Sequence, residues 1–248
     1  MKKRKNMSVS VVSEQGERCY MEDTHSIDED FMGKGWFFGG VYDGHGGSRP
    51  AKYAAKYIQK AFAECLLRGH SPAEAITMAY EDVSNRMHWA VHCGTCAANF
   101  LVSDGQIHYS NAGDCRIVVV GENITELTTD HRIFNKDEAV RIHYCGGRIR
   151  GFRVVCGYRG LMPTRCLGDQ PFKKIGVVAT PSIGSYKIKR TDRFLVAGTD
   201  GLFDEVDNFV IQELSKRKRK SSTYAKALLQ EVQNRHGHDN LTIIVLKL

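Results

Sequence analysis

The strand-like runs of this chain are joined by tight turns, whereas its helical segments come in adjacent pairs. Between residues 96 and 127, β-prone runs are separated by Ser103-Asp104-Gly105, Asn111-Ala112-Gly113-Asp114 and Gly121-Glu122-Asn123, which are turn sequences at hairpin spacing. Tight turns imply antiparallel strands. The order of segments therefore argues against alternating βαβ units and favours antiparallel sheets sandwiched between helical layers.

Two neighbouring helices are predicted on sequence spacing and end signals. Apolar residues three and four apart predict a helix over about 53–66, with Pro50 near its start and Gly69 just past its end. A second helix follows, because Ser71 and Glu74 form a capping box ahead of an apolar stripe. Shorter helices are expected at 136–144, 209–214 and 224–232, and strands at 7–14, 36–42, 148–156, 176–179, 193–197 and 241–246.

The composition indicates one compact unit. Hydrophobic residues make up 42% of the 248 residues, no internal repeat is visible, and we expect a single domain over 1–248 with a basic tail at 1–6. The net charge of +7 comes from two basic runs, at 2–5 and 216–220, and the remaining chain is slightly acidic. Such runs can act as nuclear-import signals or dock an acidic partner. Both lack the interleaved aromatic residues of a nucleic-acid surface, so we interpret them as solvated segments and expect no nucleic-acid partner.

The number of cysteines and the hydropathy of the sequence indicate the cellular compartment of the protein. Its eight cysteines are scattered, and a chain of this length folds without disulfide staples, so we expect free thiols in a reducing compartment. No apolar run approaches the 18 residues of a membrane span. These features predict a cytoplasmic or nuclear protein with no membrane partner.

Short acidic motifs lie beside several of the predicted strands. Asp43-Gly44 and Asp200-Gly201 follow apolar runs, Asp239-Asn240 precedes one, and Glu22-Asp23 and Asp114 lie near others. As many as six carboxylates could therefore meet at one sheet edge, where they would need protons or hard cations to offset their repulsion. Oxygen ligands favour Mg²⁺ or Mn²⁺. Any single Asp-Gly is more often a turn, so the prediction depends on the ordered set.

The ordered set resembles the metal-dependent protein serine/threonine phosphatases of type 2C, over nearly the whole chain. The matching segments are Arg18–Asp23, Val41–Gly47, Gly94–Ala97, Asn111–Arg116, Thr164–Asp169, Thr199–Asp204 and Asp239-Asn240. The resemblance implies an α+β fold, a four-layer sandwich of two antiparallel β-sheets flanked by helix pairs. This agrees with the layered architecture expected from the turns and helix pairs.

The resemblance also implies a reaction, the hydrolysis of phosphoserine and phosphothreonine in proteins by a water that bridges two Mn²⁺ or Mg²⁺ ions. Asp43 would bridge both ions, and the Gly44 carbonyl would hold one of them. Asp200 and Asp239 would complete the shell, and Glu22 would act partly through bound water. The implied partners are phosphorylated proteins, and the expected state is a monomer.

Other roles follow from the same resemblance. Arg18 would clamp the phosphate with its fork of donors, and His45 would protonate the departing serine or threonine oxygen. Asp114 with Asp200 would form a third, weaker metal site, and Asp23 would orient metal-bound water.

Two further matching residues, Arg165 and Asp169, are interpreted as a structural ion pair or loop anchor rather than as catalytic groups. Pro163 and Cys166 depart from the residues usual around that motif, so the local backbone there is expected to differ. The loops beside the predicted metals look short, which concerns substrate choice more than metal chemistry.

Alternative readings of the same residues are weaker. A cysteine-dependent phosphatase loop would begin at His92-Cys93 and needs arginine where Asn99 stands. Cys93 and Cys96 form a single pair with no second pair to complete a zinc site, and segment 28–33 is interpreted as a loop rather than an EF-hand. The main rival is a catalytically inactive relative that serves as a binding platform, but such relatives usually lack a ligand, and here all are present.

Overall fold

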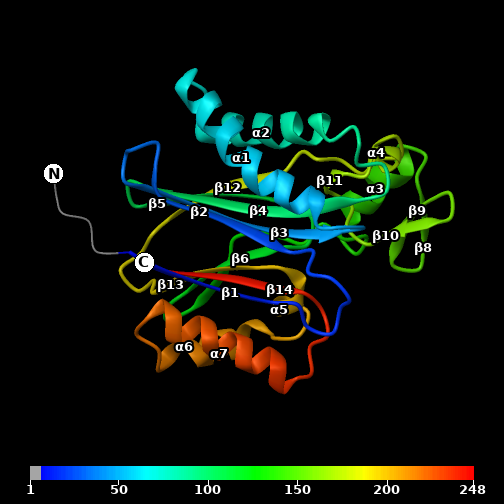
Figure 1. The fold of residues 1–248 in the computed structure, drawn as a ribbon. Helices are drawn as coiled ribbons and strands as arrows, with labels where there is room; N and C mark the ends of the chain where they lie inside the picture. The colour runs from blue at the N-terminus through cyan, green and yellow to red at the C-terminus, as the bar shows by residue number, and fades with distance from the viewer. Residues whose placement is uncertain (1–6) are drawn as a thin grey trace.

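Two stacked β-sheets form the centre of the molecule (Figure 1). The computed structural model describes residues 7–248. One sheet has the order β12 (Ser182–Lys187), β5 (Gln106–Ala112), β4 (Gly94–Ser103), β3 (Trp36–His45) and β2 (Thr24–Phe31), with the short β11 (Leu167–Gly168) paired to β4. The other has the order β1 (Ser8–Glu14), β14 (Leu241–Lys247), β13 (Phe194–Gly198), β6 (Arg116–Val120) and β7 (Ile124–Glu126). Neighbouring strands in both sheets are antiparallel.

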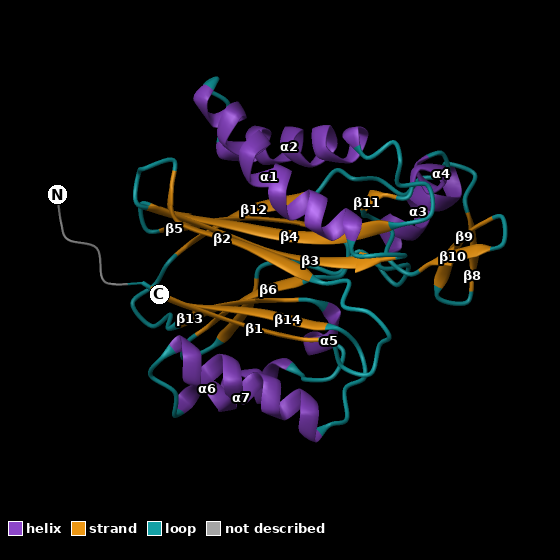
Figure 2. Cartoon of the chain, viewed as in Figure 1, coloured by secondary structure: helices purple, strands orange, loops and turns teal. Residues whose placement is uncertain are grey.

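A pair of helices covers the outer face of each sheet (Figure 2). The covering pairs are α1 (Arg49–Leu67) with α2 (Pro72–Arg86), and α6 (Asn208–Lys216) with α7 (Ser221–Asn234). The predicted α+β four-layer sandwich is therefore confirmed. The remaining elements lie toward one end of the sandwich, and they are α3 (Lys136–Tyr144), β8 (Arg148–Arg150), β9 (Arg153–Cys156), β10 (Arg159–Leu161), α4 (Gln170–Lys173) and α5 (Asp200–Phe203).

Side-chain alternation along β3 explains why its sequence is apolar throughout. Phe37 and Val41 pack between the two sheets, whereas Phe38 and Tyr42 pack beneath α1 and α2. Successive residues of a strand point to opposite faces, so a strand buried on both faces shows no polar alternation. All four side chains are at most 2% exposed.

The predicted start of α2 is confirmed in detail. The Ser71 hydroxyl accepts from the Glu74 amide, and the Glu74 carboxylate accepts from the Ser71 amide, which completes the capping box. The match follows from the local nature of this signal, because all its partners lie within one turn.

Four local expectations were wrong. The turn at 111–114, expected at hairpin spacing, carries the chain from β5 in one sheet to β6 in the other. Segment 28–31, expected as a loop, belongs to β2, because buried Phe31 stacks on Phe38 and Phe62 and holds the chain against the sheet. Segment 176–179 forms a single bridge, between Val178 and Arg165, rather than a strand. Segment 148–156 folds into two strands that turn at Gly151, which has a φ of 58°.

The basic runs fall at the edges of this architecture. The run at 2–5 lies outside the described residues. The run at 216–220 starts at the last residue of α6, where Lys216 pairs with Glu213, and ends just before α7. Within residues 7–248, the helices are too short or too polar to cross a bilayer.

Candidate functional site

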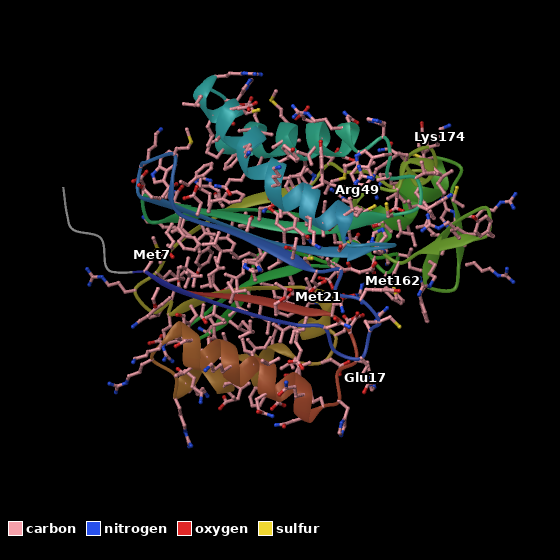
Figure 3. The ribbon with its side chains drawn as sticks, in the orientation of Figure 1. Met7, Glu17, Met21, Arg49, Met162 and Lys174 are labelled. Carbon is pink, nitrogen blue, oxygen red and sulfur yellow. The ribbon has the colours of Figure 1, made fainter. Side chains whose placement is uncertain are left out.

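A cleft of about 520 Å³ opens at the end of the sandwich that carries β8–β10. Figure 3 labels Met21 and Met162 at this end and Met7 at the opposite end. The acidic residues that line the cleft come from both sheets and from the turns beside them, and they are Glu22, Asp43, Asp114, Asp200 and Asp239.

The strand directions explain why residues so distant in sequence meet here. Asp43 lies near the end of β3, and Asp200 follows the end of β13 by two residues. Asp239 precedes β14, which runs antiparallel to β13 and is tied to it by a bond from the Thr199 amide to the Thr242 carbonyl. The end of one strand and the start of its antiparallel neighbour lie at the same edge of a sheet. The expected convergence of Asp43, Asp200 and Asp239 is therefore what the structure shows.

The carboxylates of Asp43, Asp114 and Asp200 form the centre of this cluster, with oxygen atoms within 4.8 Å of one another. Burial, followed by the charge of Asp200, raises the pKa of Asp43 well above its usual range. Burial and the charge of Asp114 raise the pKa of Asp200 to about 8. Without cations, the carboxylates of Asp43, Asp114 and Asp200 therefore repel one another and favour protonation. This arrangement fits a site for hard divalent cations.

Three more residues of the predicted set, Asp23, Glu22 and Gly44, lie close to this cluster. Asp23 is 6% exposed and accepts a hydrogen bond of 2.8 Å from the Thr199 hydroxyl, and burial raises the pKa of Asp23 to about 7. Glu22 accepts a hydrogen bond from the Gly47 amide. Gly44 has no room for a side chain, because a Cβ there would lie 2.5 Å from the Glu22 carbonyl oxygen.

Arg18 lies at the mouth of the cleft. Its guanidinium donates to Asp239 at 2.5 Å and remains substantially exposed. Although burial lowers the pKa of Arg18, the hydrogen bond and charge of Asp239 outweigh it and raise the pKa above its usual value. Arg18 therefore stays charged, and its side chain is 60% exposed at the cleft.

Arg132 is a site residue that the sequence reasoning missed. Its guanidinium lies 2.8 Å from Asp114, 3.2 Å from Asp200 and 2.9 Å from Asp204. Burial lowers the pKa of Arg132, but the charges of Asp114 and Asp204 outweigh burial and raise it. The guanidinium thus bridges Asp114 and Asp200, the two residues predicted to share a third metal. Arg132 lies between β7 and α3, outside the segments that the sequence analysis singled out.

His45 is held by a buried carboxylate. Its Nε2 contacts Asp169, which is fully buried and lies in the left-handed region with a φ of 46°. The Cys166 thiol donates to the same carboxylate at 3.5 Å. Gly94 leaves space for this contact, because a Cβ there would lie 2.1 Å from Asp169 Oδ2.

The expected ion pair between Arg165 and Asp169 is wrong. Arg165 pairs with Glu138 at 2.6 Å and donates to the Thr180 carbonyl, so it anchors a loop as the alternative reading predicted. Asp169 instead contacts the ring of His45, which places it beside the cleft. In the motif Thr164–Asp169, Arg165 therefore anchors a loop and Asp169 contacts a residue of the cleft.

Comparison with known proteins is consistent with this geometry. The family model for protein phosphatase 2C matches residues 7–241. The chain belongs to the protein phosphatase 2C family. "Probable protein phosphatase 2C 2" of Arabidopsis thaliana is 32% identical over 96% of this chain and 67% of its own length. "Probable protein phosphatase 2C 25" of the same plant is 34% identical over 96% of this chain and 64% of its own length. The chain therefore spans about two thirds of the length of these two curated relatives.

Two solved structures share the fold. A serine-threonine phosphatase 2C from Toxoplasma gondii superposes with a TM-score of 0.86 at 18% identity, covering 97% of this chain and 94% of that one. A Caenorhabditis elegans sex determining protein superposes with a TM-score of 0.84 at 21% identity, covering 99% and 66%. At these identities the likeness concerns the four-layer sandwich.

Proposed function

We propose that this protein phosphatase 2C domain hydrolyses phosphoserine and phosphothreonine in proteins with the help of two Mn²⁺ or Mg²⁺ ions. The observation that supports it is the partly buried cluster of Asp43, Asp114 and Asp200, whose oxygen atoms lie within 4.8 Å of one another. Bound cations would lower the pKa of water and neutralise charge on the phosphate. The raised pKa values of Asp43 and Asp200 fit this assignment, because a cation would replace the protons that these groups otherwise keep.

All five residues of the ligand set that we propose line the cleft. Asp43 would hold both ions, the Gly44 carbonyl would hold one of them, and Asp200 and Asp239 would complete the shell. Glu22 would act partly through bound water. Asp23 would orient ligand water.

A third ion between Asp114 and Asp200 would have to displace or accommodate the Arg132 guanidinium, which already contacts both carboxylates. Such an ion would therefore bind more weakly than the other two.

Arg18 and His45 carry the remaining roles in the proposal. Arg18 would bind phosphoryl oxygens with the donors that its contact to Asp239 leaves available. His45 would donate a proton to the departing oxygen. Because its Nε2 is engaged by Asp169, we assign that proton to Nδ1. Asp169 would fix the orientation of the ring.

The remaining assignments rest on sequence more than on the site. We propose that 1–248 constitutes one catalytic domain, active as a monomer in the cytoplasm or nucleus on phosphorylated proteins, without nucleic-acid or membrane partners. The eight free cysteines fit a reducing compartment. The alternative, an inactive binding platform, is less well supported, because the carboxylates lie together in one cleft together with Arg18 and His45.

The direct test is release of phosphate from a phosphothreonine peptide with Mn²⁺ added and with a chelator. We expect turnover with Mn²⁺ that disappears in chelator and returns when Mn²⁺ is restored. Turnover that persists in chelator would contradict the role of cations. Peptide binding without turnover under any condition would favour the inactive platform.

Arg18→Ala is expected to raise KM for the phosphopeptide about 10- to 100-fold, because a charge-assisted hydrogen bond contributes about 1.5–3 kcal/mol. Arg18→Lys should recover only part of the loss, since a single ammonium cannot bond two oxygens in the fork geometry. Steady-state kinetics of the two variants provide the measurement. A fall in kcat at unchanged KM would show that Arg18 does not bind phosphate in the ground state.

A further inference from the structure

Arginines gather on the small sheet β8–β10, which lies beside the catalytic cleft. Between Glu138 and Asp169 the chain has no acidic residue, and the sheet carries Arg148, Arg150 and Arg153. We call these three side chains the arginine face. All three are exposed.

Strand register places the three arginines on one face. Arg150 pairs with Arg153 across β8 and β9, and Arg148 lies two residues before Arg150, so the three side chains point the same way. The residues that alternate with them, Ile149 and Val154, pack with Phe172 in a small hydrophobic cluster. One face of the sheet thus stabilises the fold, and the other presents positive charge to solvent.

The arginine face contributes no evident stability of its own. Like charges directly opposite each other in an antiparallel pair are destabilising, and Arg150 and Arg153 are such a pair. Within residues 7–248 none of the three arginines forms an ion pair with a carboxylate. Arg153 donates a hydrogen bond of 3.4 Å to the Gly160 carbonyl, but no carboxylate of residues 7–248 offsets the repulsion between the arginines. This unbalanced positive charge fits an external anionic partner.

The arginine face adjoins the catalytic cleft. Arg153 lines the cleft together with Gly160 and Leu161 of β10. Its side chain lies across Gly160, where a Cβ would be 2.9 Å from Arg153 Cδ, so the glycine leaves space for the arginine. Arg159 also lines the cleft but donates to the His92 carbonyl at 2.7 Å, and this contact anchors the sheet to the domain.

An apolar pair lies at the turn of the same sheet. Phe152, between β8 and β9, packs its ring 5.3 Å from that of Phe134, and the two side chains are 62% and 72% exposed. A peptide that crosses the arginine face would find an apolar contact there as well as positive charge.

We propose that the arginine face binds acidic side chains that flank the phosphorylated residue, so the preferred substrates are phosphoproteins with Asp or Glu near the phosphoserine or phosphothreonine. The inference rests on the proposed function for its substrate and on charge complementarity for its specificity. Such binding would give the cleft a preference among phosphorylated substrates that the metal ligands alone do not supply.

The test compares phosphothreonine peptides of one length whose flanking residues are Glu, Gln or Lys. For the wild-type protein we expect kcat/KM to be about five- to tenfold higher with Glu than with Gln, and lowest with Lys, as two exposed charge pairs allow. The ratio should shrink as salt rises, because exposed charges are screened.

Variants locate the preference. In the double variant Arg150→Gln with Arg153→Gln, the Glu-to-Gln ratio should fall to within twofold of one. Its thermal midpoint should not drop, because the change removes a repulsive pair. The matched control, Arg217→Gln with Arg219→Gln, makes the same charge change beyond the end of α6 and should keep the wild-type ratio.

The outcomes separate this inference from the proposed function. Equal kcat/KM for Glu and Gln peptides in the wild type, or an unchanged ratio in the arginine-face variant, would overturn it. The Kd of each peptide is measured alongside by fluorescence anisotropy. Absence of turnover with the Glu preference retained in Kd would refute the phosphatase activity while supporting the arginine face.

Discussion

Asp43→Asn is expected to lower Mn²⁺-dependent turnover of a phosphothreonine peptide by more than about a hundredfold. Mutation of a residue that only hydrogen-bonds to a metal ligand already lowers metal affinity or activity by about 10- to 100-fold. Asp43 lies at the centre of the carboxylate cluster, where its oxygens are within 4.8 Å of those of Asp114 and Asp200. An amide has one oxygen and no charge, so it cannot bridge two cations.

The same substitution is expected to stabilise the cation-free protein. Burial and the charge of Asp200 raise the pKa of Asp43, so the folded state binds its proton more tightly than the unfolded state does. The stability that this proton confers is complete below about pH 4 and is lost as pH rises through the raised pKa. Asparagine keeps the shape without the repulsion. In chelator the variant should therefore melt at a higher temperature than wild type at pH 8, and the difference should narrow toward pH 4.

Thermal melts of the wild type with and without Mn²⁺ complete this prediction. The cation should raise the melting temperature of wild type at pH 8 and have little effect on Asp43→Asn. Asp82→Asn, which alters an exposed pair with Arg86, is the matched control and should behave as wild type. If Asp43→Asn melts below wild type in chelator at pH 8, the cluster is not repulsive and its role as a cation site is in doubt.

Glu138→Gln is expected to destabilise the fold by about 3–5 kcal/mol, the usual cost of breaking a buried ion pair from one side. The Glu138 carboxylate is 1% exposed and receives bonds of 2.6 Å from Arg141, Arg165 and the Thr164 hydroxyl. A neutral amide would leave two partly buried guanidinium groups, those of Arg141 and Arg165, without their counter-charge. Urea unfolding at neutral pH measures the loss.

The pH dependence of this prediction has the opposite sign to that of Asp43. Burial would raise the pKa of Glu138, but the hydrogen bonds from Arg141 and Arg165 outweigh burial and lower it well below its usual range. The stability from this group is therefore present above about pH 4.5 and is lost as pH falls toward the lowered pKa. Wild type and variant should converge in acid.

A control for Glu138 uses a solvated pair. Glu213 pairs with Lys216 on the surface of α6, and Glu213→Gln should cost no more than about 0.5 kcal/mol. An equally small change in Glu138→Gln would show that the Glu138 network adds nothing to stability. A large change would explain how Arg165 is held, and with it the Thr164 segment beside the cleft.

The sequence by itself determined the features whose interacting residues are close together along the chain. The capping box of Ser71 and Glu74 sets the start of α2, because each partner lies within one turn of the other. The turns at 103–105 and 121–123 set the hairpins β4–β5 and β6–β7 for the same reason, whereas the turn at 111–114 joins β5 to a strand of the other sheet. The convergence of Asp43, Asp200 and Asp239 also followed from sequence, since each flanks a strand and antiparallel strands bring such flanks to one edge.

Contacts between distant loops were decided only by the tertiary structure. Nothing near Arg132 distinguishes Asp114, Asp200 and Asp204 as its partners, and nothing near Asp169 selects His45 over Arg165. A guanidinium or a carboxylate pairs with whichever opposite charge the packed backbone brings within about 4 Å. Coulomb energy depends on the distance between the two charges and not on their separation in the sequence. The arginine face also depends on the tertiary structure. Packing of Ile149 and Val154 on one side of the small sheet fixes the strand register, and that register places the arginines together on the other side.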